Sequence, residues 1–162
     1  MKSDERFVES PLEPPLDFLQ HLWRLNHALE RASLRMERTL GVTAQQRLFV
    51  RCIGKYPGMT ASQLATVLHL DRGTVSVGLR RLAKKGLLTR RRDPRDHRRV
   101  ALGLTSKGRA LDRPHPSTVE FAVKQVMTRV SSSDTKRVKA VLSSLAGALS
   151  EILEPGGKRR DR

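Results

Sequence analysis

The chain has 162 residues, 38% of them hydrophobic and only 4% aromatic, so it can form one domain with a core of mainly leucine, valine and alanine. No run approaches the roughly 18 consecutive apolar residues of a membrane-spanning helix, and the single cysteine, Cys52, excludes an intramolecular disulfide and a cysteine-rich metal site. The net charge of +16 indicates a polyanionic partner, with nucleic acid ahead of an anionic membrane surface.

The N-terminal part of the chain divides into a polar segment and a long amphipathic helix. Residues 1–15 contain three prolines and no apolar signal core, so we expect a flexible lead-in and a cytoplasmic protein. Over residues 16–40 the apolar side chains recur every three or four residues, at Phe18, Leu22, Leu25, Leu29, Ala32 and Met36. This heptad-like seam predicts a helix whose apolar side needs a partner.

Two shorter helices are expected next. Thr43 is a suitable N-cap for a helix that ends near Lys55, with Leu48, Val50, Cys52 and Ile53 as its apolar side. After the turn at residues 56–58, Thr60 and Gln63 fit a capping box, in which each side chain satisfies a free backbone N–H group of the other residue. Leu64, Ala65 and Leu68 follow as the buried side of that helix.

A fourth helix begins near Asp71 and ends at Gly86, and together with the third it has the spacing of a helix-turn-helix. Its buried stripe is Val75, Leu79 and Leu82. Arg72, Gly73, Ser76, Val77 and Arg80 then point away from the core, with Thr74 near the N-terminal end. In a helix-turn-helix this outer face enters the major groove of DNA, where arginine can bind guanine and a valine can contact a thymine methyl group.

An arginine-rich stretch, RRRDPRDHRR, occupies residues 90–99 between two short apolar runs at 87–89 and 100–104. The runs predict a β-hairpin, and a basic hairpin directly after a helix-turn-helix is a wing that reaches into the adjacent minor groove. Pro94 and Asp93 favour the turn, and the two aspartates supply counter-charge that can orient particular arginines. From residue 72 to residue 99 the chain has eleven basic and two acidic residues.

The C-terminal part is again helical. A short helical turn after Thr105 is interrupted by Pro114 and Pro116, and a helix follows over Val119 to Val130. Ser131 and Asp134 can cap the last helix, in which Val138, Leu142, Leu145, Leu149 and Ile152 form a second heptad-like seam. Residues 154–162 form a basic tail that we expect to be flexible.

At residues 56–111 the sequence resembles the winged helix-turn-helix core of the MarR family of bacterial transcription regulators. The most specific pieces are LDRGTVSVGLRRLAKKGLL and DPRDHRRV followed by LTSKG. The order of helices on both sides is similar as well. The resemblance implies a mainly α fold with a small β-hairpin, in which residues 41–112 bind DNA and residues 16–40 and 113–153 form helical dimerisation arms.

The resemblance also implies the function. A homodimer would bind a palindromic operator, most often as a repressor. In this family a small aromatic effector often binds between the dimerisation and DNA-binding lobes and changes their spacing. Asp96-His97-Arg98 matches the family's Asp-x-Arg wing motif, which makes Arg98 the first and Arg95 the second candidate for the minor groove. The predicted DNA-binding residues are Thr60, Ser62, Gln63, Arg72, Thr74, Ser76, Val77, Arg80, Arg95, Asp96, Arg98 and Arg99.

Several positions depart from the family pattern. Val77 stands where a basic residue is common, Gly78 where an apolar one is common, and Arg80 where an acidic one is common, so the operator sequence cannot be inferred. His69 occupies a turn position that often has glycine, and histidine tolerates the left-handed conformation better than most residues. The two prolines interrupt a segment that the family usually has as one long helix.

Other functions find less support in the sequence. No phosphate-binding loop, nucleophile elbow, paired carboxylates or clustered metal ligands are apparent, so we expect neither an enzyme, a cofactor nor a metal. The family's peroxide-sensing cysteine lies near the start of the first helix, whereas Cys52 has the neighbours of a small buried hydrophobic residue. Trp23, His27, Arg47 and Phe49 are effector-crevice candidates, with core or surface positions as the alternative. The alternative function is a structural nucleoprotein that binds nucleic acid by charge alone.

Overall fold

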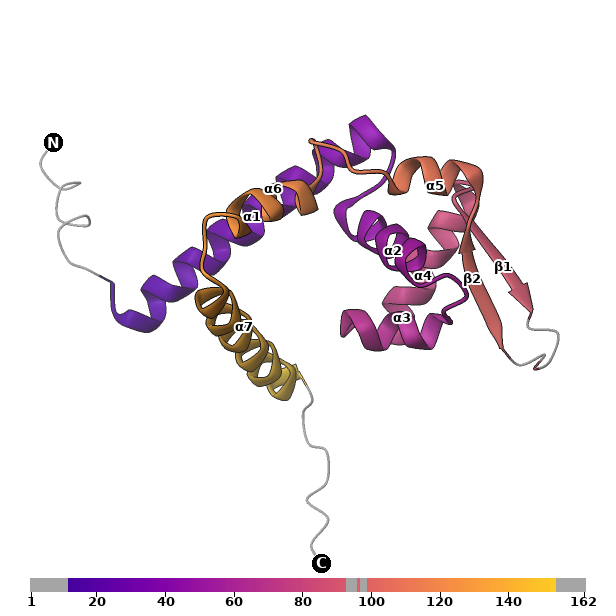
Figure 1. The fold of residues 1–162 in the computed structure, drawn as a ribbon. Coiled ribbons are helices and arrows are strands. Elements are labelled where there is room, and N and C mark those ends of the chain that lie inside the picture. The colour runs from indigo at the N-terminus through magenta and orange to yellow at the C-terminus, as the bar shows by residue number, and fades with distance from the viewer. Residues whose placement is uncertain (1–11, 93–95, 97–98, 154–162) are drawn as a thin grey trace, which may run out of the picture. The chain divides into compact units, whose positions relative to one another are not determined.

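The computed structural model of the chain describes residues 12–92, 96 and 99–153. In chain order the elements are α1 (Pro14–Leu40), α2 (Ala44–Lys55), α3 (Ala61–Leu68), α4 (Arg72–Lys84), β1 (Leu88–Arg92), β2 (Val100–Leu104), α5 (Ser106–Asp112), α6 (Val119–Met127) and α7 (Ser132–Leu153) (Figure 1). The expected fold class is confirmed, because the helices are accompanied by a two-stranded antiparallel sheet. Contacts within the chain define two units, residues 1–119 and 120–162.

The core of the first unit is built around α2. Phe49, Val50 and Ile53 are almost completely buried and face apolar side chains from α3, α4 and both strands. These partners are Leu64, Val75, Leu79, Leu82, Leu88 and Leu102. The third and fourth helices therefore cannot separate from the hairpin without exposing one shared core.

The apolar side of α2 differs from the predicted one. Leu48 is 47% exposed, whereas Phe49 is fully buried. A helix turns by about 100° per residue, so Phe49, Val50 and Ile53 share one face and Leu48 lies outside it. Cys52 is half-buried and packs at the edge of the core.

Side-chain caps define where the helices of the first unit begin. Thr60 Oγ1 accepts a hydrogen bond from the Gln63 backbone at 3.2 Å, and Gln63 Oε1 accepts one from the Thr60 backbone at 2.8 Å. The predicted capping box of α3 is thus confirmed. Thr43 and Gln46 form a second capping box at α2, and the Asp71 carboxylate caps α4.

The turn between α3 and α4 depends on His69. Its φ of 52° and ψ of 42° place it in the left-handed region, as the sequence predicted for this position. Its backbone N–H still bonds to carbonyl groups at the end of α3, so the tight connection keeps its hydrogen bonds. The helix-turn-helix geometry is therefore reached without glycine at the turn.

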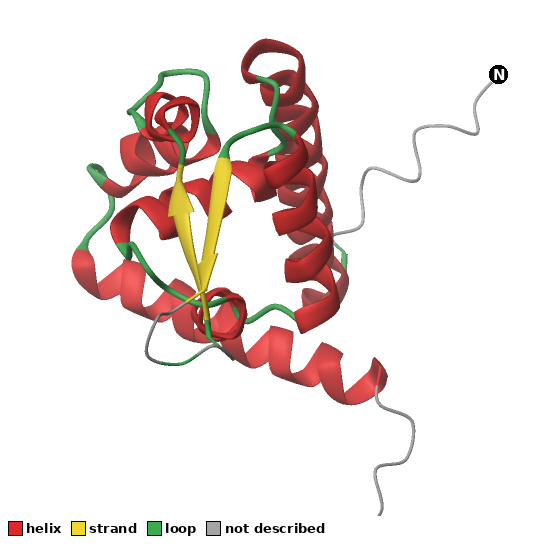
Figure 2. Cartoon of the chain, turned by 90° about the vertical axis from the view of Figure 1, so that its right-hand side faces the viewer, coloured by secondary structure: helices red, strands yellow, loops and turns green. Residues whose placement is uncertain are grey.

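Strand β1 is longer than the predicted run at 87–89, whereas β2 spans the predicted residues 100–104. β1 continues to Arg92, and β2 pairs with it throughout, with Arg91 opposite Ala101 and Arg92 opposite Val100. Figure 2 shows the two strands running side by side. Arg90, Arg91 and Arg92 were expected at the tip of the wing. They lie on β1 instead, because each of them pairs with a residue of β2.

Helix α1 begins at Pro14, two residues before the expected start, which agrees with the preference of proline for the first helical turn. Its seam is only partly covered within the chain. Met36 is fully buried, while Phe18, Leu25 and Leu29 are each at least 40% exposed. The N-terminal part of the helix therefore presents an apolar stripe to the outside.

Helices α6 and α7 make up most of the second unit. The backbone between α5 and α6 is not helical from Arg113 to Thr118, which includes both prolines, so the predicted interruption is confirmed. Ser131 caps α7, since its hydroxyl accepts from the Asp134 backbone at 3.0 Å. The α7 seam is exposed at Val138, Leu142, Leu149 and Ile152. Within the described residues, none of the helices is long and apolar enough to cross a membrane.

Candidate nucleic-acid interface

The outer face of α4 is the first component of the site. Arg72, Ser76 and Arg80 are exposed, and Val77 is 41% exposed, whereas the stripe of Val75, Leu79 and Leu82 is buried. The predicted division of this helix into a buried and a free face is therefore confirmed. The free face offers guanidinium donors, one hydroxyl group and one apolar contact to a ligand.

Gly78 explains how α4 approaches the core so closely. A Cβ atom at this position would lie 3.1 Å from Cδ2 and 3.2 Å from Cζ of Phe49, and closer still to Cε2. Such separations are shorter than carbon atoms accept, so only glycine allows the Phe49 ring to lie directly against the α4 backbone. The glycine that costs helix propensity in this position thus sets the distance between α2 and α4.

Thr74 has a local role in addition to any contact with a ligand. Its hydroxyl donates to Asp71 Oδ2 at 2.5 Å, and its backbone N–H donates to Asp71 Oδ1 at 2.8 Å. The hydrogen bonds from the Thr74 side chain and then its backbone lower the pKa of Asp71. Asp71 thus stays ionised and fixes the N-terminal turn of α4, where Arg72 begins the exposed face.

The N-terminal end of α3 is the second component. The Thr60 and Gln63 side chains are engaged in the capping box, while Ser62 is exposed. A helix N-terminus presents free N–H groups and a positive partial charge, which suit a phosphate group. Of the three predicted side chains at this end, Ser62 is thus the one that is exposed and takes no part in the capping box.

A hollow of about 440 Å³ connects the components within the first unit. It is lined by five of the predicted residues, Thr60, Ser62, Ser76, Asp96 and Arg99, together with Ala61, Arg90, Val100 and the core residues Leu79 and Leu102. The α3 cap, the middle of α4 and the base of the wing therefore meet at one concave surface. Gln63 lies on a neighbouring open hollow that also includes Arg99.

The wing arginines on β1 face opposite sides. Side chains alternate along a strand, so Arg90 and Arg91 point to different faces of the hairpin. Arg90 lines the hollow next to Ser76, whereas Arg91 lines a hollow behind the wing with Gly54 and Asp112. The structure thus places Arg90 on the α4 side of the wing.

The structure describes only some of the remaining residues that were predicted for the wing. Arg95 and Arg98 lie outside the described residues, as do Asp93, Pro94 and His97. Asp96 and Arg99 are exposed, and the Arg99 backbone N–H donates to the Asp96 carbonyl at 2.8 Å. The proposed orientation of Arg98 by Asp96 therefore remains a prediction.

Two groups of contacts were not identified from the sequence. Arg47 is almost completely buried and donates to the Arg113 carbonyl at 2.8 Å, and Arg51 binds the Asp112 carboxylate at 2.7 Å, so both hold the end of α5 against α2. Lys85 binds the corner between α1 and α2. Side chains that meet across about 40 or 60 residues leave no local signal in one sequence.

The effector-crevice candidates do not share one environment. Arg47 and Phe49 are buried in the core, whereas Trp23 is 64% exposed and His27 is exposed on α1. In the single chain, two of the four candidates are thus core residues and two are surface residues. Burial raises the pKa of the Cys52 thiol, and the positive charges of Lys55 and Arg51 oppose this shift only in part.

A helix-turn-helix with an exposed basic face, followed by an arginine-bearing hairpin, defines a winged helix-turn-helix DNA-binding protein. The family model of the MarR family matches residues 42–100, which include α2 to α4 and β1. The family model and the relatives reported below support a MarR-family winged-helix regulator, and the regulators of this family are DNA-binding proteins and not enzymes.

Relatives resemble the chain over most of its length. The organic hydroperoxide resistance transcriptional regulator of Bacillus subtilis is 28% identical over 149 residues, covering 90% of this chain and 97% of the relative. An HTH-type transcriptional repressor of Mycobacterium tuberculosis is 25% identical, covering 82% of this chain and 94% of the relative.

Two similar solved structures contain DNA. Streptococcus pneumoniae FabT in complex with DNA is 27% identical with a TM-score of 0.59, and 84% of this chain and 95% of that chain are covered. A mutant MarR from Escherichia coli complexed with operator DNA is 26% identical with a TM-score of 0.62, and the shares covered are 82% and 94%.

Proposed function

We propose that this regulator is a homodimeric repressor that acts in the bacterial cytoplasm, on the nucleoid, by binding a palindromic operator. In the proposal α4 enters the major groove and the wing enters the adjacent minor groove. The observation that carries it is the shared concave surface of the α3 cap, α4 and the wing, to which Ser62, Ser76, Arg90 and Arg99 contribute. The DNA complexes of FabT and MarR support the assignment of double-stranded DNA as the ligand.

The dimer part of the proposal rests on the exposed seams. Phe18, Leu25 and Leu29 on α1, and Val138, Leu142 and Ile152 on α7, remain exposed in the single chain. Apolar stripes at heptad spacing are stable in water when a second helix covers them. We assign residues 16–40 and 113–153 to dimerisation and residues 41–112 to DNA binding.

A two-fold dimer explains why a palindrome is expected. Each protomer presents the same α4 face, so the preferred DNA repeats the same half-site in inverted orientation. The half-sites are then about one helical turn, roughly 34 Å, apart. Occupation of such a site within a promoter would exclude polymerase, which is the basis for proposing repression.

The wing contributes through the minor groove, whose narrow A·T-rich segments have an enhanced negative potential that attracts arginine. We assign this contact to Arg98, oriented by Asp96, with Arg95 as the second candidate. The Arg98→Ala variant should therefore lose operator affinity strongly. Arg90→Ala should lose less affinity and mainly show a lower dependence on salt, because Arg90 would contact phosphate. Equal losses of operator affinity in both variants would indicate that residues 90–99 act only through their charge.

Release by a small aromatic effector completes the proposal and rests on the family alone. A series of phenols and benzoates, titrated into the protein–operator complex, tests this part. An effector shifts the operator equilibrium only if it binds the free protein more tightly than the complex. Unchanged operator affinity across the series would leave a repressor controlled by abundance or by a protein antagonist.

The test of the central function is a binding titration with two DNA fragments at two salt concentrations. One fragment contains the palindrome from the intergenic DNA beside the gene, and the other has the same length and a random sequence. Specific binding should be at least about 10³-fold tighter than random binding. If both fragments bind alike and weaken together with salt, the chain is a nucleoprotein that recognises charge alone.

The dimer can be tested by light scattering. The protein should be dimeric at micromolar concentration and should dissociate on dilution to nanomolar concentration. A stable monomer at micromolar concentration contradicts the dimer.

A further inference from the structure

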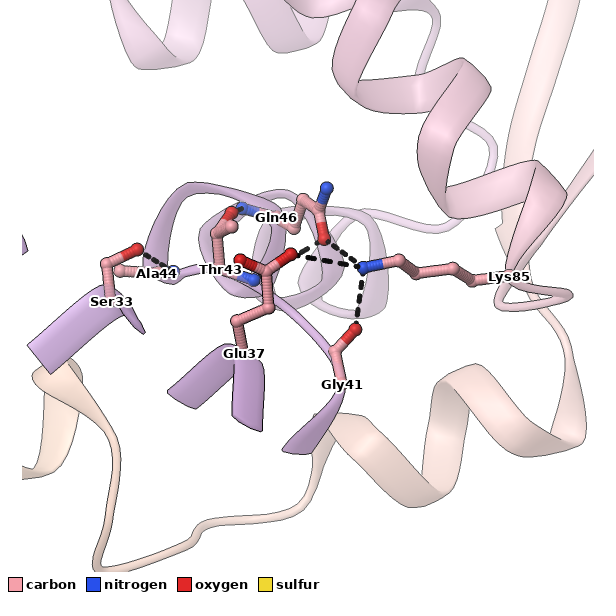
Figure 3. A network of polar contacts seen from close by, with 7 residues as sticks. All are labelled: Ser33, Glu37, Gly41, Thr43, Ala44, Gln46 and Lys85. Carbon is pink, nitrogen blue, oxygen red and sulfur yellow. Dashed lines mark hydrogen bonds and ion pairs between the residues drawn. The ribbon is translucent and has the colours of Figure 1, made fainter. Parts of the chain in front are cut away.

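Lys85 follows the last residue of α4, and its ammonium group reaches back to the corner between α1 and α2 (Figure 3). Nζ lies 2.7 Å from the Gly41 carbonyl oxygen, 3.0 Å from Gln46 Oε1 and 3.9 Å from Glu37 Oε1. These acceptors belong to the C-cap of α1, the first turn of α2 and the last turn of α1. The ammonium group therefore donates to the Gly41 and Gln46 oxygens and forms a longer ion pair with the Glu37 carboxylate.

The electrostatics of this corner favour a cation. The C-terminal end of α1 has a negative partial charge from its free carbonyl groups, and Gly41 is its left-handed cap residue. Gln46 Oε1 also accepts from the Thr43 backbone at 3.4 Å, so Lys85 is joined to the capping box of α2. The contact thus stabilises the end of one helix and the beginning of another.

Other contacts hold the backbone at the same point from the side of α5. The Lys107 ammonium donates to the Lys85 carbonyl at 3.2 Å, and the Thr105 hydroxyl donates to the Gly86 carbonyl at 2.7 Å. The end of α4 is therefore attached to three other helical elements of the first unit. Of the three side chains that make these contacts, those of Lys107 and Thr105 come from α5 and its N-cap, and that of Lys85 comes from the C-cap of α4.

Lys85 differs in this respect from the basic residues of the DNA-facing surface. Arg72 and Arg80 are exposed on the free face of α4, and the neighbouring Lys84 is exposed as well. The Lys85 side chain is 34% exposed, and its charged end is directed to the α1–α2 corner. The positive charge of Lys85 thus interacts with groups of the protein itself.

We propose that Lys85 is a positioning residue for operator recognition, which fixes α4 against the α1–α2 corner without touching DNA. This inference rests on the proposed function, in which α1 belongs to the dimer and α4 reads the operator. The attachment would keep each α4 at a fixed angle to the helix that sets the half-site spacing. Hydrogen bonds to base edges need this fixed angle of α4, because they weaken steeply when donor and acceptor are misaligned. Contacts with phosphate tolerate misalignment better.

The experiment compares Lys85→Met with Lys84→Met, which removes the same charge from the adjacent, exposed position. Operator and random DNA are titrated with full-length protein at several salt concentrations, at a temperature where circular dichroism shows each variant folded. For Lys85→Met we expect about tenfold weaker operator binding, with random-DNA affinity and salt slope unchanged. For Lys84→Met we expect a small, equal loss on both DNAs, with a salt slope lower by at most about 1.

Two results would overturn the inference. If Lys85→Met weakens both DNAs equally and lowers the salt slope, Lys85 contacts phosphate directly. If it lowers the melting temperature but leaves operator affinity unchanged, its role is limited to stability. Failure of the proposed function is a separate result, in which the wild-type protein itself does not distinguish operator from random DNA.

A second pair of variants keeps the test decisive if Lys85→Met does not fold. Lys85→Arg and Lys84→Arg both retain the charge, but a planar guanidinium group cannot direct donors to three acceptors around one point. Operator affinity should fall for Lys85→Arg and stay unchanged for Lys84→Arg. Equal operator affinities of the two arginine variants would contradict a positioning role.

Discussion

Gly78→Ala is the substitution for which the structure gives the sharpest expectation. Alanine has the better helix propensity, and in the interior of a helix the exchange from glycine normally stabilises by about 0.5–1 kcal/mol. At this position the new methyl group would meet the buried Phe49 ring, with Cδ2 at 3.1 Å, Cζ at 3.2 Å and Cε2 closer still. Either the ring or α4 must move.

The overpacking cost is expected to exceed the gain in propensity. Forcing an extra carbon into a filled core costs about 1–3 kcal/mol, so the net loss of unfolding free energy should be about 1–2 kcal/mol. For a chain of this length each kcal/mol lowers the melting temperature by about 2–4 °C. We expect operator binding to weaken as well, because α4 is displaced from α2.

The chain offers a matched control in Gly147 of α7. Apart from the adjoining helix backbone, no atom of the described residues lies within 4 Å of a Cβ built at this position, so Gly147→Ala should stabilise by about 0.5–1 kcal/mol. Thermal and denaturant unfolding of both variants, and of Gly78→Ala combined with Phe49→Leu, measure the difference. The smaller leucine should recover part of the loss, with a coupling energy of about 0.5 kcal/mol or more. If Gly78→Ala stabilises the protein as much as Gly147→Ala does, the argument from close approach is refuted.

Three further predictions concern the wing, the cysteine and the α4 cap. Arg91→Ala should weaken operator binding less than Arg90→Ala, because Arg90 lines the hollow beside Ser76 and Arg91 the hollow behind the wing; the reverse order in a DNA titration would contradict the assignment of faces. Cys52 should react slowly with iodoacetamide at pH 7, because burial raises its pKa and lowers the thiolate fraction, and organic hydroperoxide should not release the operator through it. Release that disappears in Cys52→Ser would show the opposite. Asp71 has a lowered pKa in the folded state, so its contribution to stability should be complete above about pH 5 and fade as the pH falls through that pKa. Unfolding of wild type and Asp71→Asn should therefore differ at pH 7 and converge in acid, and a difference that persists at pH 2 would contradict the linkage.

The helices and their ends could be predicted because their signals are local. The Thr60–Gln63 capping box, the buried stripe of α4 and the left-handed turn at His69 each involve residues within one or two turns. Periodicity and capping act over such distances, and they depend little on the rest of the fold. The hairpin followed from two short apolar runs around the arginines, and the family resemblance added the homodimer and the role of Arg98.

The tertiary structure decided the details that depend on residues far apart in the sequence. The sequence indicated Leu48 as part of the α2 core, but the partners that surround the helix select Phe49 instead. In the sequence Gly78 was only a departure from the family pattern, and its position against Phe49 gives the reason for glycine there. Lys85 resembled its neighbour Lys84 in sequence, and only the fold brings its ammonium to Gly41 and Gln46, because acceptors about 40 residues away are positioned by packing and not by local pattern.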